Sequence, residues 1–76
     1  MTQYTVENDN GMQHIATNTN EPRLRVLTED QIAKMSDGSF RHYKRKVNAW
    51  RESVHNHGTP EAIRTIDYLY HACGRR

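Results

Sequence analysis

Four side chains that can bind a metal ion lie close together in the second half of the chain. They form an H-x-H…H-x-C pattern made of His55, His57, His71 and Cys73. Four nitrogen or sulfur ligands are what a structural zinc site requires. In a helix, however, two residues separated by one other point about 160° apart, so His71 and Cys73 of a predicted helix cannot share one ion. We therefore predict no metal site and no other cofactor.

Cys73 is also the strongest candidate for a nucleophile. The helical pattern places it on an apolar face, where a thiol lacks the polar surroundings that activate it. The chain has no G-x-S-x-G, P-loop or Gly-rich dinucleotide motif. With 76 residues it also has little material for a closed pocket. We predict that the protein is not an enzyme and acts by presenting a surface.

The segment from Ser39 to about Asn56 offers such a surface. Its apolar residues recur at steps of three and four, which is the period of an amphipathic helix. Cationic side chains flank this apolar seam, so a packing face and a cationic face lie side by side. We expect Trp50 to hold the helices together. The seam consists of Phe40, Tyr43, Val47, Trp50 and Val54.

The cationic flank leads to our prediction for the function. We expect a small protein-binding module (an inhibitor, adaptor or regulatory subunit) of a size typical of phage or mobile-element proteins. Tyrosine and arginine are enriched at binding hot spots, and Tyr68 lies beside Arg64 on the polar side of the last predicted helix. The predicted contact residues are Arg41, Lys44, Arg45, Asn48, Arg51, His55, Arg64 and Tyr68.

The charge distribution indicates the chemistry of the partner. Residues 1–38 carry three basic and six acidic side chains, whereas residues 39–76 carry eight basic and three acidic ones. The C-terminal half is therefore a cationic pole, and we expect a partner with an acidic surface: a protein first, a nucleic acid second. The chain itself is expected to be a monomer or a weak homodimer.

Composition and cysteine content limit the setting. The single cysteine excludes an internal disulfide, and no apolar run approaches the ~18 residues that span a membrane. The first ten residues lack the basic-then-apolar order of a secretory signal. We therefore expect a cytoplasmic protein with no membrane partner.

The fold that must position these residues is predicted to be α+β, in a single domain over residues 1–76. Residues 1–22 would form a polar hairpin or arm and a loop, and residues 23–76 a mainly helical core. Asn10-Gly11 is a strong signal for a two-residue hairpin turn. With that turn Glu7 faces His14 and Val6 faces Ile15. Residues 23–26 alternate basic and apolar side chains and could add a third strand.

Three helices are predicted after this β element. Thr28 and Gln31 form a capping box for the first helix, which we expect to end at Asp37-Gly38. Ser39 is expected to cap the second helix, which would stop at Gly58. Thr59 caps the third helix, with proline at its first position and Gly74 at its end. The predicted buried face of that helix contains Ala62, Ile63, Ile66, Leu69, Tyr70 and Cys73.

Two alternative arrangements remain open. The first two helices resemble the layout of a helix-turn-helix, in which Arg41, Lys44 and Arg45 would contact phosphates or guanine edges of DNA or RNA. In that case the protein would be a small nucleic-acid-binding regulator. The apolar seam could instead pair with its copy in a dimer, although it spans only about two heptads.

Overall fold

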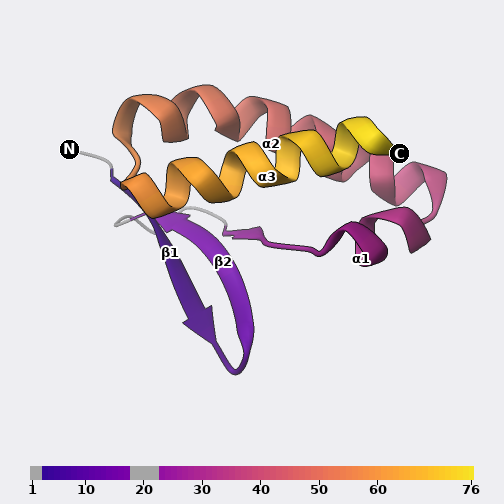
Figure 1. The fold of residues 1–76 in the computed structure, drawn as a ribbon, viewed down its shortest axis with the longest axis horizontal. Coiled ribbons are helices and arrows are strands. Elements are labelled where there is room, and N and C mark those ends of the chain that lie inside the picture. Colours follow the sequence, from indigo (N-terminus) through magenta and orange to yellow (C-terminus); the bar gives the residue numbers. More distant parts are fainter. Residues whose placement is uncertain (1–2, 18–22) are drawn as a thin grey trace.

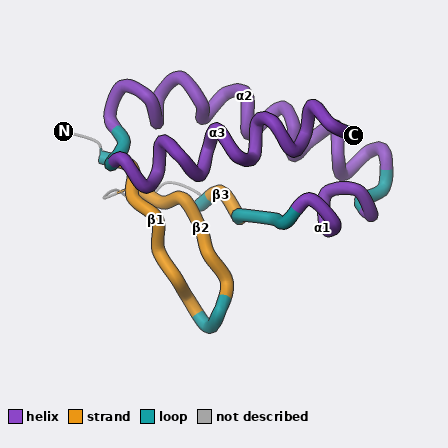
Figure 2. Tube along the Cα trace, in the orientation of Figure 1, coloured by secondary structure: helices purple, strands orange, loops and turns teal. Residues whose placement is uncertain are grey.

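The computed structural model describes residues 3–17 and 23–76, and it has the predicted α+β architecture (Figures 1 and 2). Three antiparallel strands precede three helices: β1 (Tyr4–Asp9), β2 (Met12–Thr17), β3 (Leu24–Arg25), α1 (Glu29–Lys34), α2 (Asp37–His57) and α3 (Pro60–Arg75). The helices α2 and α3 run side by side as one layer, and the β1–β2 hairpin projects away from them. Thr17, predicted to begin the loop that precedes residue 23, belongs to β2, and the rest of that loop, residues 18–22, lies outside the described residues.

The hairpin has the predicted register. Asn10 and Gly11 form the turn with φ values of 54° and 80°, which asparagine and glycine tolerate better than other residues. Glu7 pairs with His14 and Val6 with Ile15, as the turn requires. The third strand is also confirmed, with Leu24 opposite Ile15 in the sheet order β1-β2-β3.

The core lies between the sheet and the two long helices. Ile15 and Leu24 from the sheet belong to the same buried cluster as Val47 and Val54 from α2, and all four are at most 2% exposed. The apolar seam of α2 is thus used within the chain. Trp50 is half-buried and packs edge-on against Tyr4 of β1, with ring centroids 5.4 Å apart. It therefore attaches α2 to the hairpin.

The junction of α1 and α2 differs from the prediction. The capping box at Thr28 and Gln31 is present, but α1 ends at Lys34 and Met35 is already extended. Ser36, not Ser39, is the N-cap of α2: its hydroxyl accepts a hydrogen bond from the Ser39 amide at 3.3 Å. Asp37 and Gly38 were expected to end a helix and instead form the first turn of the next one. The acidic Asp37 is favourable there because the N-terminal end of a helix is electropositive.

The α2–α3 connection is tight and follows the prediction. Gly58 closes α2 by donating its amide to the Val54 carbonyl at 2.6 Å, and Thr59 caps α3 by accepting from the Ala62 amide. The Thr59 amide also donates to the Tyr4 carbonyl at 3.0 Å, which joins this connection to β1. Gly74 does not end α3, which continues to Arg75. Gly74 keeps a negative φ and so lacks the left-handed conformation by which a glycine commonly ends a helix.

Candidate interaction surface

Four of the eight predicted contact residues line a groove between α2 and α3. Two adjoining depressions of about 470 and 390 Å³ run along it, and both are lined by Asn48 and Tyr70. The four predicted residues in this groove are Lys44, Asn48, Arg51 and His55. They recur along α2 at steps of four, three and four, so the helix period places them on the same flank.

At one end of this groove, polar side chains of α2 and α3 contact each other. The carboxylate of Asp67 on α3 lies 2.7 Å from Nε2 of His55 and 3.8 Å from Nε of Arg51. The Arg51 guanidinium also lies 4.2 Å from the centre of the Tyr70 ring, which is a cation–π contact. Arg51 and His55 are therefore engaged in holding α2 against α3.

Tyr70 is a candidate contact residue that the sequence analysis placed wrongly in the core. It is 40% exposed, and Ala72 is buried in its place. The cause is geometric: Tyr70 lies at the border of the apolar face of α3, and its long side chain extends towards α2 under Arg51. A helical wheel indicates that border position but cannot say which neighbour covers the ring.

The first half of α2 presents three exposed cations that no described carboxylate binds. Arg41, Lys44 and Arg45 are exposed and form no ion pair with any described residue. Asp37 stands four residues before Arg41, yet its carboxylate binds the guanidinium of Arg76 at 3.0 Å. We call Arg41, Lys44 and Arg45 the cationic face. Its members point away from the core and can meet another molecule.

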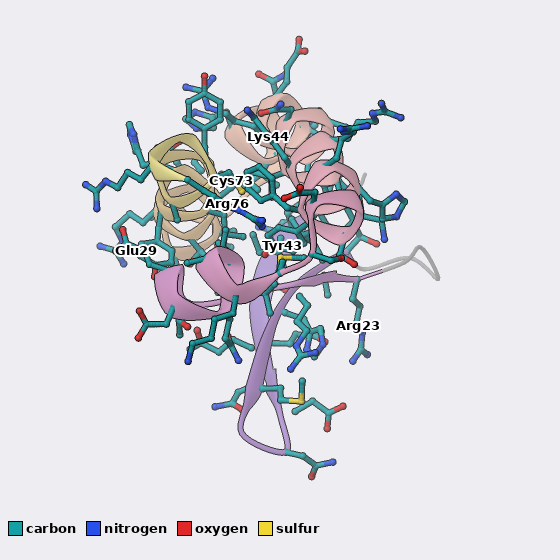
Figure 3. All side chains as sticks on the ribbon, turned by 90° about the vertical axis from the view of Figure 1, so that its right-hand side faces the viewer. Arg23, Glu29, Tyr43, Lys44, Cys73 and Arg76 are labelled. Carbon is teal, nitrogen blue, oxygen red and sulfur yellow. The ribbon has the colours of Figure 1, made fainter. Side chains whose placement is uncertain are left out.

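The C-terminal residue Arg76 shapes the edge of this face (Figure 3). Its guanidinium lies 4.4 Å from the centre of the Phe40 ring and donates to the Ile32 carbonyl at 3.1 Å. Lys44 lies over the same ring at 5.9 Å. Phe40 is therefore half-covered by two cations, which fixes the first turns of α2 against α1 and the chain end.

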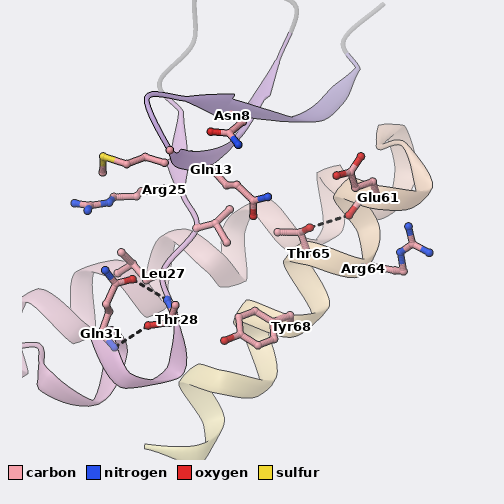
Figure 4. Close-up of a pocket in the computed structure, with 13 residues that line it drawn as sticks. Asn8, Gln13, Arg25, Leu27, Thr28, Gln31, Glu61, Arg64, Thr65 and Tyr68 are labelled. Carbon is pink, nitrogen blue, oxygen red and sulfur yellow. Dashed lines mark hydrogen bonds between the residues drawn. The ribbon is translucent and has the colours of Figure 1, made fainter.

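Arg64 and Tyr68 lie in a different place from the other six predicted residues (Figure 4). They line a groove of about 590 Å³ between the hairpin, the β3–α1 connection and α3. The Tyr68 hydroxyl accepts a hydrogen bond from the Glu29 amide at 3.1 Å, so this side chain helps to attach α1 to α3. The eight residues predicted from the sequence therefore do not form one continuous surface.

The potential metal ligands are separated in the structure. Cys73 is 3% exposed, whereas His71 is exposed and packs against Tyr70. Burial raises the pKa of the Cys73 thiol, and the positive charge of Lys44 opposes this shift only in part. Within residues 3–17 and 23–76, no three histidine, cysteine or acidic side chains are arranged to share an ion.

The first two helices are joined by a short turn, and the first of them contacts α3. Only Met35 and Ser36 separate α1 from α2, which is a shorter turn than the sequence predicted. The helix α1 is attached to α3, through an Arg75–Glu29 ion pair of 2.5 Å and the Tyr68 hydroxyl.

None of the helices formed by residues 3–17 and 23–76 has the length and apolar character needed to span a membrane.

No family model, no curated protein and no solved structure matches this chain. The assignment of a function therefore depends on the geometry described above.

Proposed function

We propose that the protein is a non-enzymatic protein-binding module, acting as an inhibitor, adaptor or regulatory subunit. It docks through the cationic face of α2 onto an acidic surface of a partner protein. The observation that supports this proposal is that three adjacent cations, Arg41, Lys44 and Arg45, have no ion pair within the described residues. Within the described residues, by contrast, Arg23, Arg51, Arg75 and Arg76 each lie within 4 Å of a carboxylate.

Arg41 and Arg45 of the cationic face form no ion pair with a described residue that would stabilise the fold. Arg41 and Arg45 are four residues apart on one helix, and like charges at this spacing destabilise a helix by about 0.2–0.5 kcal/mol. No acidic residue stands three or four positions from Lys44 or Arg45. An acidic partner would relieve this repulsion, so charge complementarity favours an encounter at this face.

The helix that presents the face is held rigidly from behind. The Tyr43 hydroxyl donates to the Arg25 carbonyl, and Val47 is 0% exposed. A surface that is ordered before binding loses little conformational entropy when it binds. Tyr70, exposed at the neighbouring α3, adds an aromatic side chain of the type enriched at binding hot spots.

A cytoplasmic location is part of this proposal. The single cysteine is free and buried, so the fold does not depend on an oxidising compartment. Nucleic acid is the second candidate partner, since phosphates could bind the same three cations.

The test compares two double charge reversals in affinity capture from lysate, with and without nuclease treatment. Arg41→Glu with Arg45→Glu changes the cationic face, and Lys34→Glu with Lys46→Glu is a control with the same change in net charge at exposed sites outside it. We expect the first variant to lose the partner, with at least a tenfold lower affinity, and the control to retain it. Equal loss in both variants would show that only total charge matters. Loss of all capture on nuclease treatment would assign the face to nucleic acid.

A further inference from the structure

The outer edge of the hairpin carries hydrogen-bonding groups that the sheet leaves unused. In the two-residue hairpin Asp9 pairs with Met12 next to the turn, so the backbone groups of Asp9, Glu7 and Thr5 point to β2. The amide and carbonyl groups of Val6 and Asn8 point the other way. No backbone hydrogen bond from a described residue outside the hairpin reaches these two residues.

The α2–α3 connection pairs with the first residue of this edge and then leaves it. Gly58 forms a parallel bridge with Tyr4, and the Thr59 amide donates to the Tyr4 carbonyl. The chain then turns into α3 at Pro60. Figure 1 shows the turn end of the hairpin projecting away from the helices. Val6 packs against the core, and Asn8 lines a groove with Thr65 of α3. An extended segment could continue along the outer edge of β1 where Thr59 leaves it.

The side chains along β1 indicate which segment this edge would accept. Glu7 and Asp9 lie on one face of the strand, and Val6 lies on the other. The guanidinium of Arg23 lies 3.5 Å from the carboxylate of Glu7 and 3.9 Å from that of Asp9, so these two carboxylates share one ion-pair partner. Arg23 comes from the β3 side of the sheet, and the side chains of Glu7 and Asp9 remain 45% and 62% exposed.

The opposite edge of the same sheet, at β3, shows an alternation of basic and apolar residues that would also suit the edge of β1. There β3 and its neighbours read Arg23-Leu24-Arg25-Val26, with basic and apolar residues in alternation. Leu24 enters the core at 2% exposure while Arg23 reaches the carboxylates of β1. A strand added to β1 would need the same alternation, to meet Val6 on one face and Glu7 and Asp9 on the other.

We propose that the free edge of β1 binds an extended segment of another protein in which basic residues alternate with apolar ones. This edge lies apart from the cationic face of α2 and does not depend on it. A second copy of β1 is disfavoured, because antiparallel pairing through Val6 and Asn8 would bring Glu7 opposite its own copy.

The proposal is tested on the full ¹⁵N-labelled chain with an eight-residue peptide in which arginine alternates with valine. We expect the largest shifts and new exchange protection at the amides of Val6 and Asn8. A peptide of the same composition with its arginines and valines in two blocks, and a peptide with glutamate for arginine, should bind at least tenfold more weakly. Shifts confined to α2 or to the β3 edge, or equal binding of the block peptide, would overturn the proposal.

Two sets of variants separate the backbone from the charges. Asn8→Pro removes an outward amide and should abolish binding, whereas Asn8→Thr keeps the amide and should bind as the wild type. Glu7→Gln with Asp9→Asn changes only exposed side chains and should weaken binding about tenfold, which tests the proposal even if the proline variant does not fold. Protection of Val6 and Asn8 without peptide, increasing with protein concentration, would instead show pairing between copies and overturn it.

Discussion

The two halves of α2 are made of similar residues but differ in what surrounds them. We call residues 47–57 the enclosed half, because contacts with neighbouring elements hold it, and residues 37–46 the open half. In the enclosed half Val54 is fully buried, Arg51 and His55 lie beside Asp67, and Gly58 closes the helix against Val54. Residues 37–46 are attached through Tyr43 and present Arg41 and Arg45 to solvent. The difference shows that a cation on an amphipathic helix is available to a partner only where no neighbouring element supplies a carboxylate.

The largest effect should come from a methyl group added where the enclosed half ends. A Cβ at Gly58 would lie 2.4 Å from the Val54 carbonyl oxygen, so Gly58→Ala must move backbone that also places the Thr59–Tyr4 hydrogen bond. We expect a loss of about 1–3 kcal/mol in the free energy of unfolding, measured by urea denaturation.

Gly38→Ala is the matched change in the open half. A Cβ there meets nothing within 4 Å, and Gly38 lies in the first turn of α2. Because alanine favours a helix over glycine by up to ~1 kcal/mol, we expect this variant to be as stable as the wild type or more so. Equal destabilisation by both substitutions would contradict the contrast between the two halves.

Tyr43 anchors the open half, and its attachment should weaken at high pH. Burial raises the pKa of the Tyr43 hydroxyl to about 12. The unfolded chain ionises this group from about pH 10 while the folded chain keeps it neutral, so stability is complete below pH 10 and falls as the pH rises towards 12. We expect a loss of about 1.4 kcal/mol per pH unit in that window.

Tyr43→Phe provides the control for this pH dependence. The variant loses the hydrogen bond to the Arg25 carbonyl and should be about 1 kcal/mol less stable at pH 7. Its free energy of unfolding should fall less steeply between pH 10 and 12 than that of the wild type. Parallel curves would assign the alkaline loss to other groups.

An effect similar in size to that of Tyr43→Phe is expected at the first turn of the open half. Ser36→Ala removes the side chain that caps α2 and should cost about 1 kcal/mol, measured by thermal unfolding. Ser39→Ala changes an exposed hydroxyl inside the helix and should alter stability by less than about 0.5 kcal/mol. If Ser39→Ala destabilised the protein more than Ser36→Ala, Ser39 would be the N-cap of α2, as the sequence predicted.

Local signals in the sequence were sufficient for most of the fold and insufficient for the candidate site. The Asn10-Gly11 turn set the register of the hairpin, and Thr28 and Thr59 marked the starts of two helices. The start of α2 was misplaced because Asp37-Gly38 suits the end of a helix as well as its first turn. Periodicity grouped Arg51 with Arg45, although only the latter lacks an acidic neighbour in the described structure.

The sequence by itself determined the order of the elements, the pairing of β1 with β2 and the apolar faces of the helices, because these depend on neighbours a few residues away. The tertiary structure alone decided which charges remain unpaired. Asp67 binds Arg51 and His55 across the α2–α3 groove. Arg76 binds Asp37, although 39 positions separate them in the chain, and the Tyr70 ring lies beside the Arg51 guanidinium. Such contacts depend on how helices pack against each other, and no local pattern of residues specifies that packing.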